Sequence, residues 1–417
     1  MKSAVTHPIF FVFFWFVLSM NLVKAQIQVN GTVRDANSND VIPYANVYLK
    51  GTHLGTVANA SGEFGINVEG DDKILVFSSI GFLSKEIVIK ELDFENGEIN
   101  IYLENATYVL NPVVVPNADL ILKEAIKRIP QNYSSDYMEL TTFYRELIKK
   151  NNAFVDISQG VLKIYKAPYL VRERGDPKYE DQISVQKGHR LTNYTRNDTL
   201  AFKVMGGPTT MMRLDIIKNP GSILSEQSIT LYEYNISGIQ TIDGRRSYEL
   251  SFKQKPEADV DELLYEGTIY IDEKSFAIAG ITFTMPQESL GIAAENLIIQ
   301  RPSLAILTHE KLYYEVRYRV AGGLWYLDYV RNEIEMKVNW RRKLFNSHFR
   351  AVTELVVTDK REGKPDLHAV EERAFSRHKN LFSDQIKGLE DTEYWEDFSI
   401  IRPEEDLKKA IKKISNN

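Results

Sequence analysis

The sequence predicts a mainly β protein: an N-terminal β-sandwich, then a larger curved antiparallel sheet or open barrel with a few helices. Three observations support this fold class. Apolar and polar residues alternate between turn residues from Ile27 to Leu103. Long alternating runs flank the turns at Asp243-Gly244, Asp272–Ser275 and Gly322-Gly323, which is the hairpin pattern. Helical periodicity is confined to a few segments, so strands dominate both halves.

The first segment, Met1–Ala25, is predicted to be an export signal that is removed. It has Lys2 near its start, an apolar core over Ile9–Met20 and a small-x-small cleavage motif at Val23-Lys24-Ala25. An uncleaved anchor helix is the alternative, but the apolar core is short for crossing a bilayer. No later apolar run is long enough for a transmembrane helix, so we expect none in the mature chain.

Residues 26–104 are predicted to form the β-sandwich. Glycines punctuate this stretch and suit tight corners because they reach positive φ without steric cost. The run Ile74–Phe77 is continuously apolar, so both of its faces should be buried. The predicted strands are Val29–Val33, Ala45–Leu49, Ile74–Phe77, Glu86–Ile89 and Ile99–Leu103.

Five short motifs in this stretch carry a family resemblance. They are Gly31-Thr32-Val33 with Asp35, Pro43-Tyr44-Ala45-Asn46-Val47, Gly51-Thr52 with Gly55-Thr56, Ser61-Gly62-Glu63-Phe64, and Ser79-Ile80-Gly81-Phe82. Together they resemble the carboxypeptidase regulatory-like domain, a transthyretin-like sandwich. That resemblance implies a folding or interaction module without an active site. In Bacteroidota this domain commonly begins cell-envelope proteins, including TonB-dependent receptors.

Residues 105–116 are predicted to be a linker. Its Tyr108–Val115 run resembles the segment that follows the same sandwich in Bacteroidota receptors. The roughly 300 residues that remain are too few for a receptor's plug and barrel, so we do not expect a receptor.

Residues 117–358 are predicted to be the antiparallel β-rich domain, led by a helix from Asn117 to Ile129. Asn117 should cap this helix and Pro130 should end it. Its predicted apolar face consists of Leu120, Leu122, Ala125, Ile126 and Ile129. This helix and the later element Phe143-Tyr144-Arg145-Glu146 resemble a group of uncharacterised Bacteroidota envelope proteins.

The strands of this domain should form an antiparallel meander. We expect strands at Thr141–Ile148 and Phe154–Ala167, joined by a turn at Asn151-Asn152. A short helix is expected in Thr209–Ile217, with its methionines filling the core. The helix-then-meander order, with Ile271, Asp272 and Ile278 at one turn, is similar to the periplasmic lipoprotein-carrier fold, which implies an open barrel holding acyl chains.

Residues 359–417 are predicted to be a charged tail with a terminal helix after Pro403. Acidic residues open this helix and lysines close it, as the helix dipole favours. Its apolar stripe consists of Leu407, Ala410, Ile411 and Ile414. We expect a packed terminal helix. A membrane-surface helix is the alternative that the acidic first turn disfavours.

The sequence predicts no catalytic, cofactor-binding or metal-binding residues. His368 and Glu371 match the His-x-x-Glu zinc pair, but only His378 follows as a further histidine. The acidic groups Asp71-Asp72 and Glu404–Asp406 are expected to have structural roles at a turn and a helix start, with acid–base catalysis as the alternative. The basic cluster Arg341-Arg342-Lys343 is expected to be a solvated turn, with contact to an anionic glycan or lipid headgroup as the alternative.

Composition limits the function further. The 417 residues carry a net charge of −6 and no cysteine, so neither a nucleic-acid footprint nor a cysteine nucleophile is expected. We therefore predict an exported, non-catalytic binding or scaffold protein of the periplasm or outer-membrane periphery, which binds a protein partner or an apolar ligand. A periplasmic lipid or lipoprotein carrier and a zinc carboxypeptidase-like hydrolase are the alternatives.

Overall fold

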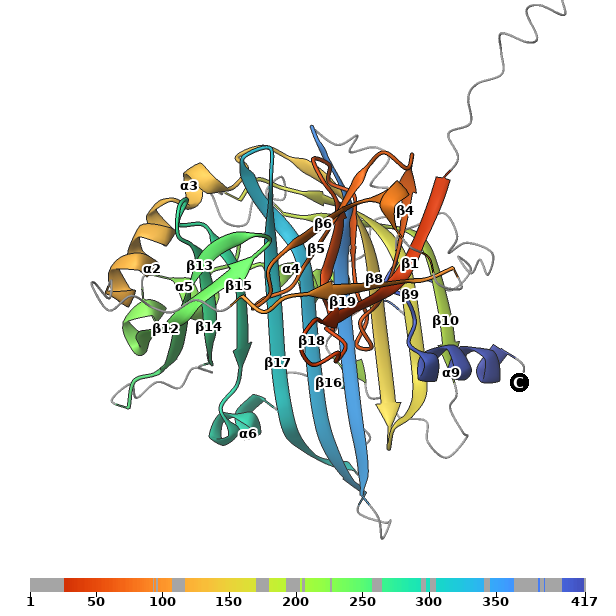
Figure 1. Ribbon diagram of the computed structural model, residues 1–417. Coiled ribbons are helices and arrows are strands. Elements are labelled where there is room, and N and C mark those ends of the chain that lie inside the picture. Colours follow the sequence, from red (N-terminus) through yellow and green to blue (C-terminus); the bar gives the residue numbers. More distant parts are fainter. Residues whose placement is uncertain are drawn as a thin grey trace, which may run out of the picture.

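The computed structural model shows a mainly β protein, as the sequence predicted (Figure 1). It describes residues 26–92, 94, 97–106, 117–169, 180–192, 203–204, 207–225, 227–256, 265–293, 298–300, 305–340, 346–363, 382, 386 and 400–415.

The N-terminal sandwich consists of two small sheets packed around one apolar core. One sheet has the order β4-β1-β7 and the other β3-β2-β5-β6. The strands are β1 (Gln26–Asp35), β2 (Asn46–Leu49), β3 (Gly55–Val57), β4 (Glu63–Glu69), β5 (Ile74–Ser78), β6 (Lys85–Val88) and β7 (Ile99–Leu103), and a 3-10 turn η1 covers Ile89–Glu91. Leu75 and Phe77 lie in the sandwich core and Val76 is buried as well, so the prediction that β5 is covered on both faces is confirmed.

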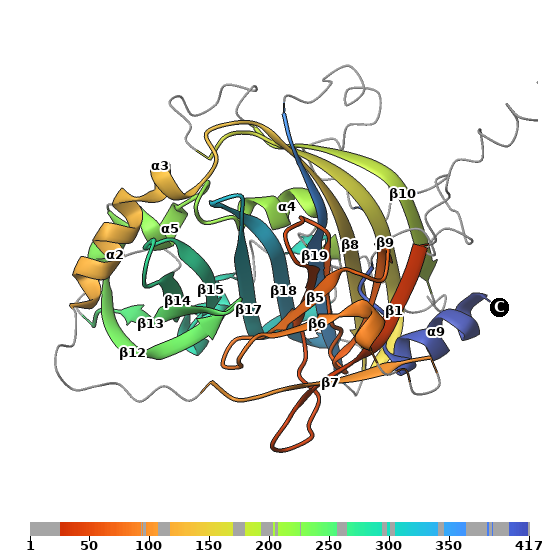
Figure 2. The same cartoon turned by 45° about the horizontal axis from the view of Figure 1, so that its top comes forward.

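The larger body is a ten-stranded antiparallel sheet with the order β10-β9-β8-β19-β18-β17-β15-β14-β13-β12. Its strands are β8 (Met138–Lys150), β9 (Ala153–Lys166), β10 (Gln182–Thr192), β12 (Tyr232–Ile242), β13 (Arg245–Gln254), β14 (Glu266–Asp272), β15 (Ile278–Thr284), β17 (Ala305–Ala321), β18 (Leu324–Trp340) and β19 (Ser347–Glu362). β10 and β12 stand at opposite ends of this order, so the sheet is curved but not closed (Figure 2). A two-stranded sheet pairs β11 (Lys203–Val204) with β16 (Ile298–Gln300).

Helices cover one face of the large sheet and share its apolar core. They are α2 (Ala118–Lys127), α3 (Ile129–Asn132), α4 (Pro208–Arg213) and α5 (Gly221–Leu224). Met211 and Met212 of α4 are buried in this core, as predicted. Smaller elements are η3 (Ser228–Leu231), η4 (Gln287–Ser289) and α6 (Leu290–Ala293).

The sandwich covers the opposite face, over the central strands of the large sheet (Figure 1). Val57 of β3 packs there against Phe143, Val161 and Val356 in a small apolar cluster. We call the surface where the sandwich meets the large sheet the junction.

All three predicted hairpin turns are confirmed, together with the turn at Asn151-Asn152. Asp243 and Gly244 have φ values of 48° and 72°, the left-handed pair that a type I′ turn requires.

The leading helix differs from its prediction. Asn117 caps it as expected, accepting from the backbone N–H groups of Asp119 and Leu120. However, α2 ends at Lys127, and Pro130 lies in the first turn of α3, where its missing N–H group costs nothing. Leu120 is 65% exposed, because Ile121 takes its place on the buried face.

The C-terminal elements correct one boundary and confirm one element. β19 continues to Glu362, so residues 359–362 belong to the sheet and not to a tail. The charged residues from 359 onward were predicted to form a tail, but Lys360 is buried within the strand. The terminal helix is α9 (Glu405–Ser415), and it packs on the body as predicted; Leu407 contacts the cluster of Leu147 and Ile157.

Candidate functional site

The element Phe143-Tyr144-Arg145-Glu146 lies in the middle of β8 and reaches both faces of the sheet. Because successive strand residues point to opposite faces, Tyr144 lies in the core on the helix side while Phe143 faces the sandwich. Arg145 shares the sandwich side with Phe143. Glu146 shares the helix side, where it accepts from Tyr144 Oη at 2.5 Å and from the Gly207 N–H at 3.0 Å.

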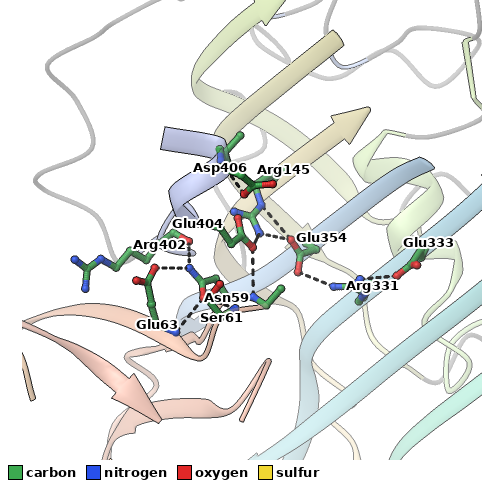
Figure 3. Close-up of polar contacts among 12 residues, drawn as sticks. Asn59, Ser61, Glu63, Arg145, Arg331, Glu333, Glu354, Arg402, Glu404 and Asp406 are labelled. Atoms are coloured by element: carbon green, nitrogen blue, oxygen red, sulfur yellow. Dashed lines mark hydrogen bonds and ion pairs between the residues drawn. The ribbon is translucent and has the colours of Figure 1, made fainter. Parts of the chain in front are cut away.

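Arg145 is the centre of a buried ion network at the junction (Figure 3). Its Nε and Nη2 donate to Glu354 Oε2 at 3.0 and 2.5 Å, and both side chains are 1% exposed. Nη2 also lies 3.5 Å from Glu404 Oε1. The second carboxylate oxygen of Glu354 accepts from Tyr329 Oη at 2.8 Å and from Arg331 Nη1 at 3.5 Å. β8, β18 and β19 thereby contribute Arg145, Arg331 and Glu354 to a single network.

Arg331 connects this network to the sandwich. It donates to Glu333 at 2.6 Å, and its guanidinium lies 4.2 Å from the ring centroid of Tyr44. Tyr44 belongs to the Pro43–Val47 motif and has a φ of 58°, which is strained for a bulky residue and places its ring over the sheet. The sandwich motif therefore supplies a side chain to the junction.

The carboxylates of the network are held ionised. Burial alone would raise the pKa of Glu354, but the charges of Arg145 and Arg331 bring it below its usual range. Burial likewise opposes the ionised form of Glu333, yet hydrogen bonds from Arg331 and Arg350 lower its pKa to about 2.

A second set of contacts joins β17 to the sandwich backbone. Arg317 Nη1 donates to the carbonyl oxygen of Tyr44 at 2.8 Å, and Arg319 Nη2 donates to that of His53 at 3.2 Å. Arg319 also pairs with Asp328 at 3.0 Å. Gly55 approaches so closely that a Cβ there would lie 2.8 Å from Arg319 Nη1, so a larger residue would force the end of the Arg319 side chain to shift.

Residues 400–406, which we call the terminal segment, pass between the two bodies. The sandwich side chains of Thr56 and Asn59 donate to the carbonyl oxygens of Ile400 and Arg402 at 3.2 and 2.9 Å. The Ala60 N–H donates to Glu404 Oε1 at 3.3 Å. On the sheet side, Glu404 pairs with Arg145, and Asp406 pairs with Lys149 at 2.7 Å. The terminal segment thus forms polar contacts with both the sandwich and the large sheet (Figure 3).

These elements line a junction cavity of about 310 Å³ that is partly open to solvent. Its lining residues are Tyr44, Ala60, Ser61, Arg145, Leu147, Lys149, Phe154, Arg331, Arg350, Val352, Glu354, Glu404 and Asp406. Arg145 Nη1 is buried and has no hydrogen-bond partner among the described residues. A second cavity, of about 500 Å³, lies between α2 and β12.

Some of the residues that the sequence singled out lie outside the described part of the chain, and others lie at the junction. The possible zinc pair, His368 and Glu371, lies outside the described residues, as do His378 and Arg341–Lys343. Glu404–Asp406 does open a helix, but Glu404 and Asp406 also form long-range ion pairs that sequence reasoning missed. In the described part of the chain, no group of three or more His, Asp or Glu side chains could hold a metal ion. None of the described helices is long and apolar enough to cross a membrane.

Comparisons with known proteins bear on the N-terminal body. Residues 29–115 match the family described as the CarboxypepD_reg-like domain. A TonB-dependent receptor, SusC, from Bacteroides thetaiotaomicron is 35% identical over 98 residues, which is 24% of this chain and 9% of the receptor. TonB-dependent receptor P3 from Formosa agariphila is 36% identical over 80 residues, 19% of this chain and 8% of the receptor. The match thus spans less than a tenth of the length of either relative.

Two solved structures are similar to the chain over a longer stretch. One is a DUF1329 family protein from Desulfovibrio piger, with 10% identity and a TM-score of 0.26, covering 60% of this chain and 94% of that one. The other is a putative outer membrane lipoprotein-sorting protein domain from Vibrio parahaemolyticus, with 12% identity and a TM-score of 0.24, covering 61% and 98%.

Proposed function

We propose that this chain is a non-catalytic binding protein of the cell envelope, whose two β bodies act as one unit with a binding site at the junction. One observation carries the proposal. Tyr44, from a motif of the CarboxypepD_reg-like domain, and Arg145, from the Phe-Tyr-Arg-Glu element, line the same cavity.

The chemistry of the cavity supports binding over catalysis. A general acid or base needs a pKa near the working pH. Burial opposes the ionised form of the lining residue Glu354, but the charges of Arg145 and Arg331 hold its pKa below the usual range. Glu354 therefore stays ionised and serves to position its arginine partners.

Two observations support a location of the mature chain in the cell envelope. Met1–Ala25 has the pattern of an export signal. The curated relatives are TonB-dependent receptors. We therefore propose that the mature chain acts in the periplasm or at the outer-membrane periphery.

Two alternatives have their own tests. A lipid carrier would hold acyl chains inside the curved sheet, where Met211, Met212 and Phe382 now pack as core. Native mass spectrometry of gently purified protein would then detect bound acyl chains. A zinc hydrolase would hold metal at His368 and Glu371, which elemental analysis would detect.

The proposal is tested with the full purified chain. Peptidase and esterase substrates are assayed with and without added Zn²⁺, beside His368→Ala. We expect no turnover above the blank in any sample. Metal-dependent turnover that His368→Ala removes would overturn the non-catalytic function. In parallel, both the unchanged protein and the Ser61→Trp variant are dialysed to equilibrium against an envelope extract. The unchanged protein should retain small molecules. The variant, whose cavity is blocked, should not retain them.

A further inference from the structure

We propose that the junction cavity binds a small organic carboxylate, which accepts a hydrogen bond from Arg145 Nη1. The inference rests on the proposed binding function and names the ligand class. Arg145 is 1% exposed, yet Nη1 has no acceptor among the described residues. A buried donor left without a partner costs about 1–3 kcal/mol, and more in a charged group. An oxygen ligand that displaces the side chains covering Nη1 would remove that cost.

The guanidinium of Arg145 is fixed in orientation before any ligand arrives. Nε and Nη2 both donate to Glu354 Oε2, which restricts rotation of the guanidinium plane. Nη1 is the donor that remains. Arginine donors match carboxylate geometry and form short, charge-assisted hydrogen bonds. A fixed donor also loses little side-chain entropy on binding.

The charges around the cavity favour an anion. Four cationic side chains line it against three carboxylates, and each carboxylate is already paired. The four cations are paired as well, but two of them, Lys149 with Asp406 and Arg350 with Glu333, have side chains that are 26% and 47% exposed. They can attract an anion from solution.

One part of the lining is apolar and suits the body of an organic acid. Leu147, Val352 and Phe154 provide aliphatic and aromatic surface beside the charged groups. The volume of about 310 Å³ lies at the lower end of small-molecule sites. The ligand should therefore combine one carboxylate with a compact apolar body. A free acid and an acylated amino acid share this chemistry.

Isothermal titration calorimetry on the full chain tests the proposal with four probes: phenylacetate, N-acetylphenylalanine, phenylacetamide and inorganic phosphate. Phenylacetate should bind at one site, and the neutral phenylacetamide more than about tenfold more weakly, because it lacks the charge that pairs with Arg145. Tighter binding of N-acetylphenylalanine would identify an acylated amino acid as the source. Phosphate binding as tight as that of phenylacetate would overturn the requirement for an apolar body.

Variants locate the binding site. Ser61→Trp fills the cavity and should abolish binding. Lys149→Gln and Arg350→Gln should each weaken it about twofold to fivefold, as expected for partly exposed charges. The matched control is Lys123→Gln in the α2–β12 cavity, which should change nothing. Arg145→Gln should weaken binding more than tenfold, and circular dichroism shows whether it folds. If Arg145→Gln does not fold, Ser61→Trp, Lys149→Gln and Arg350→Gln still show whether the ligand lies in the junction cavity.

Two results would refute the inference. One is the absence of saturable binding up to about 10 mM, above the roughly millimolar Kd that fragment-sized ligands reach. The other is carboxylate binding that Ser61→Trp leaves intact, because the ligand would then lie elsewhere. The second result would leave the proposed binding function standing. Metal-dependent turnover would overturn that function even if the cavity were occupied.

Discussion

Arg145 faces the sandwich, and its chain neighbour Tyr144 faces the helices. This alternation gives one short element two tasks: packing the core on one face and holding the junction on the other. Buried ion pairs add little net stability because desolvation offsets their attraction, so we assign them the role of fixing how the two bodies meet.

Arg145→Met tests this role at the residue scale. The change leaves Glu354 buried with fewer partners, and breaking a buried pair from one side costs about 3–5 kcal/mol. Urea denaturation should show this loss in the free energy of unfolding. Lys163→Gln, which removes a partly exposed pair with Glu139, should cost less than about 1 kcal/mol. Equal effects of the two changes would contradict a special role for Arg145.

His309 provides a second residue-scale prediction. It is 2% exposed, and neither ring nitrogen has a partner in the described part of the chain. Burial lowers its pKa below the usual range, so the unfolded chain binds more protons and stability falls as the pH drops through about 6.5. His309→Leu should raise the free energy of unfolding by about 1 kcal/mol at neutral pH and by more near pH 5.5.

The matched control for that change is His348→Gln. The side chain of His348 is 60% exposed and pairs with Glu310. Its replacement should leave the pH dependence of unfolding in place, as measured by urea titrations across the same range. If His309→Leu left that dependence intact as well, another group would be responsible for it.

At the scale of elements, α9 is held by its apolar stripe. Leu407 is fully buried against β8 and β9, while Lys409 on the same helix is exposed. Leu407→Ala should cost about 2–5 kcal/mol in the free energy of unfolding, and Lys409→Ala less than about 0.5 kcal/mol. Limited proteolysis should cut the terminal segment faster in Leu407→Ala only. Equal cleavage rates would mean that α9 does not anchor this segment.

The hairpin turn between β12 and β13 also serves the junction. Asp243 accepts hydrogen bonds from Ser78 and, at 3.3 Å, from Asn46 of the sandwich, and its φ is 48°. Asp243→Ala removes both acceptors and disfavours the left-handed backbone, so it should lower the free energy of unfolding by about 1–3 kcal/mol. Asp243→Asn keeps the backbone preference and should cost less. Thermal unfolding of both variants gives the comparison.

At the scale of the whole molecule, acid should separate the two bodies. Burial opposes ionisation of Glu333, but its pairing with Arg331 and Arg350 brings its pKa to about 2, below the usual value near 4.5. A lowered folded-state pKa gives stability that is present above pH 4.5 and is lost as the pH falls towards 2. Hydrogen exchange after brief acid pulses should therefore show loss of protection at the junction strands first. In Glu333→Gln this early loss of protection should be smaller. An unchanged loss of protection would contradict the prediction.

Local patterns allowed much of the fold to be predicted. Hairpin turns, the cap at Asn117 and the terminal helix all depend on a few adjacent residues, and all are present. The short strands β3 and β4 were not predicted, because their glycine-rich stretch has a turn-like local pattern. The exposed position of Leu120 was also missed, because several apolar positions fit one helical face equally well.

The candidate site was beyond local patterns. Its ion pair joins Arg145 to Glu354, which lies 209 residues further along the chain. A charged residue in an alternating strand normally indicates the solvent face, and here that face is covered by the sandwich. The Phe-Tyr-Arg-Glu element was noted only for its resemblance to other envelope proteins, which gave its arginine no role.

The sequence by itself determined the mainly β class, the export pattern and the identity of the first domain, because these depend on periodicity and on short motifs. Only the tertiary structure decided that Tyr44, Arg145 and Glu404 line one cavity. The physical reason is that burial of a charge depends on what covers it, and here the cover comes from the two ends of the chain.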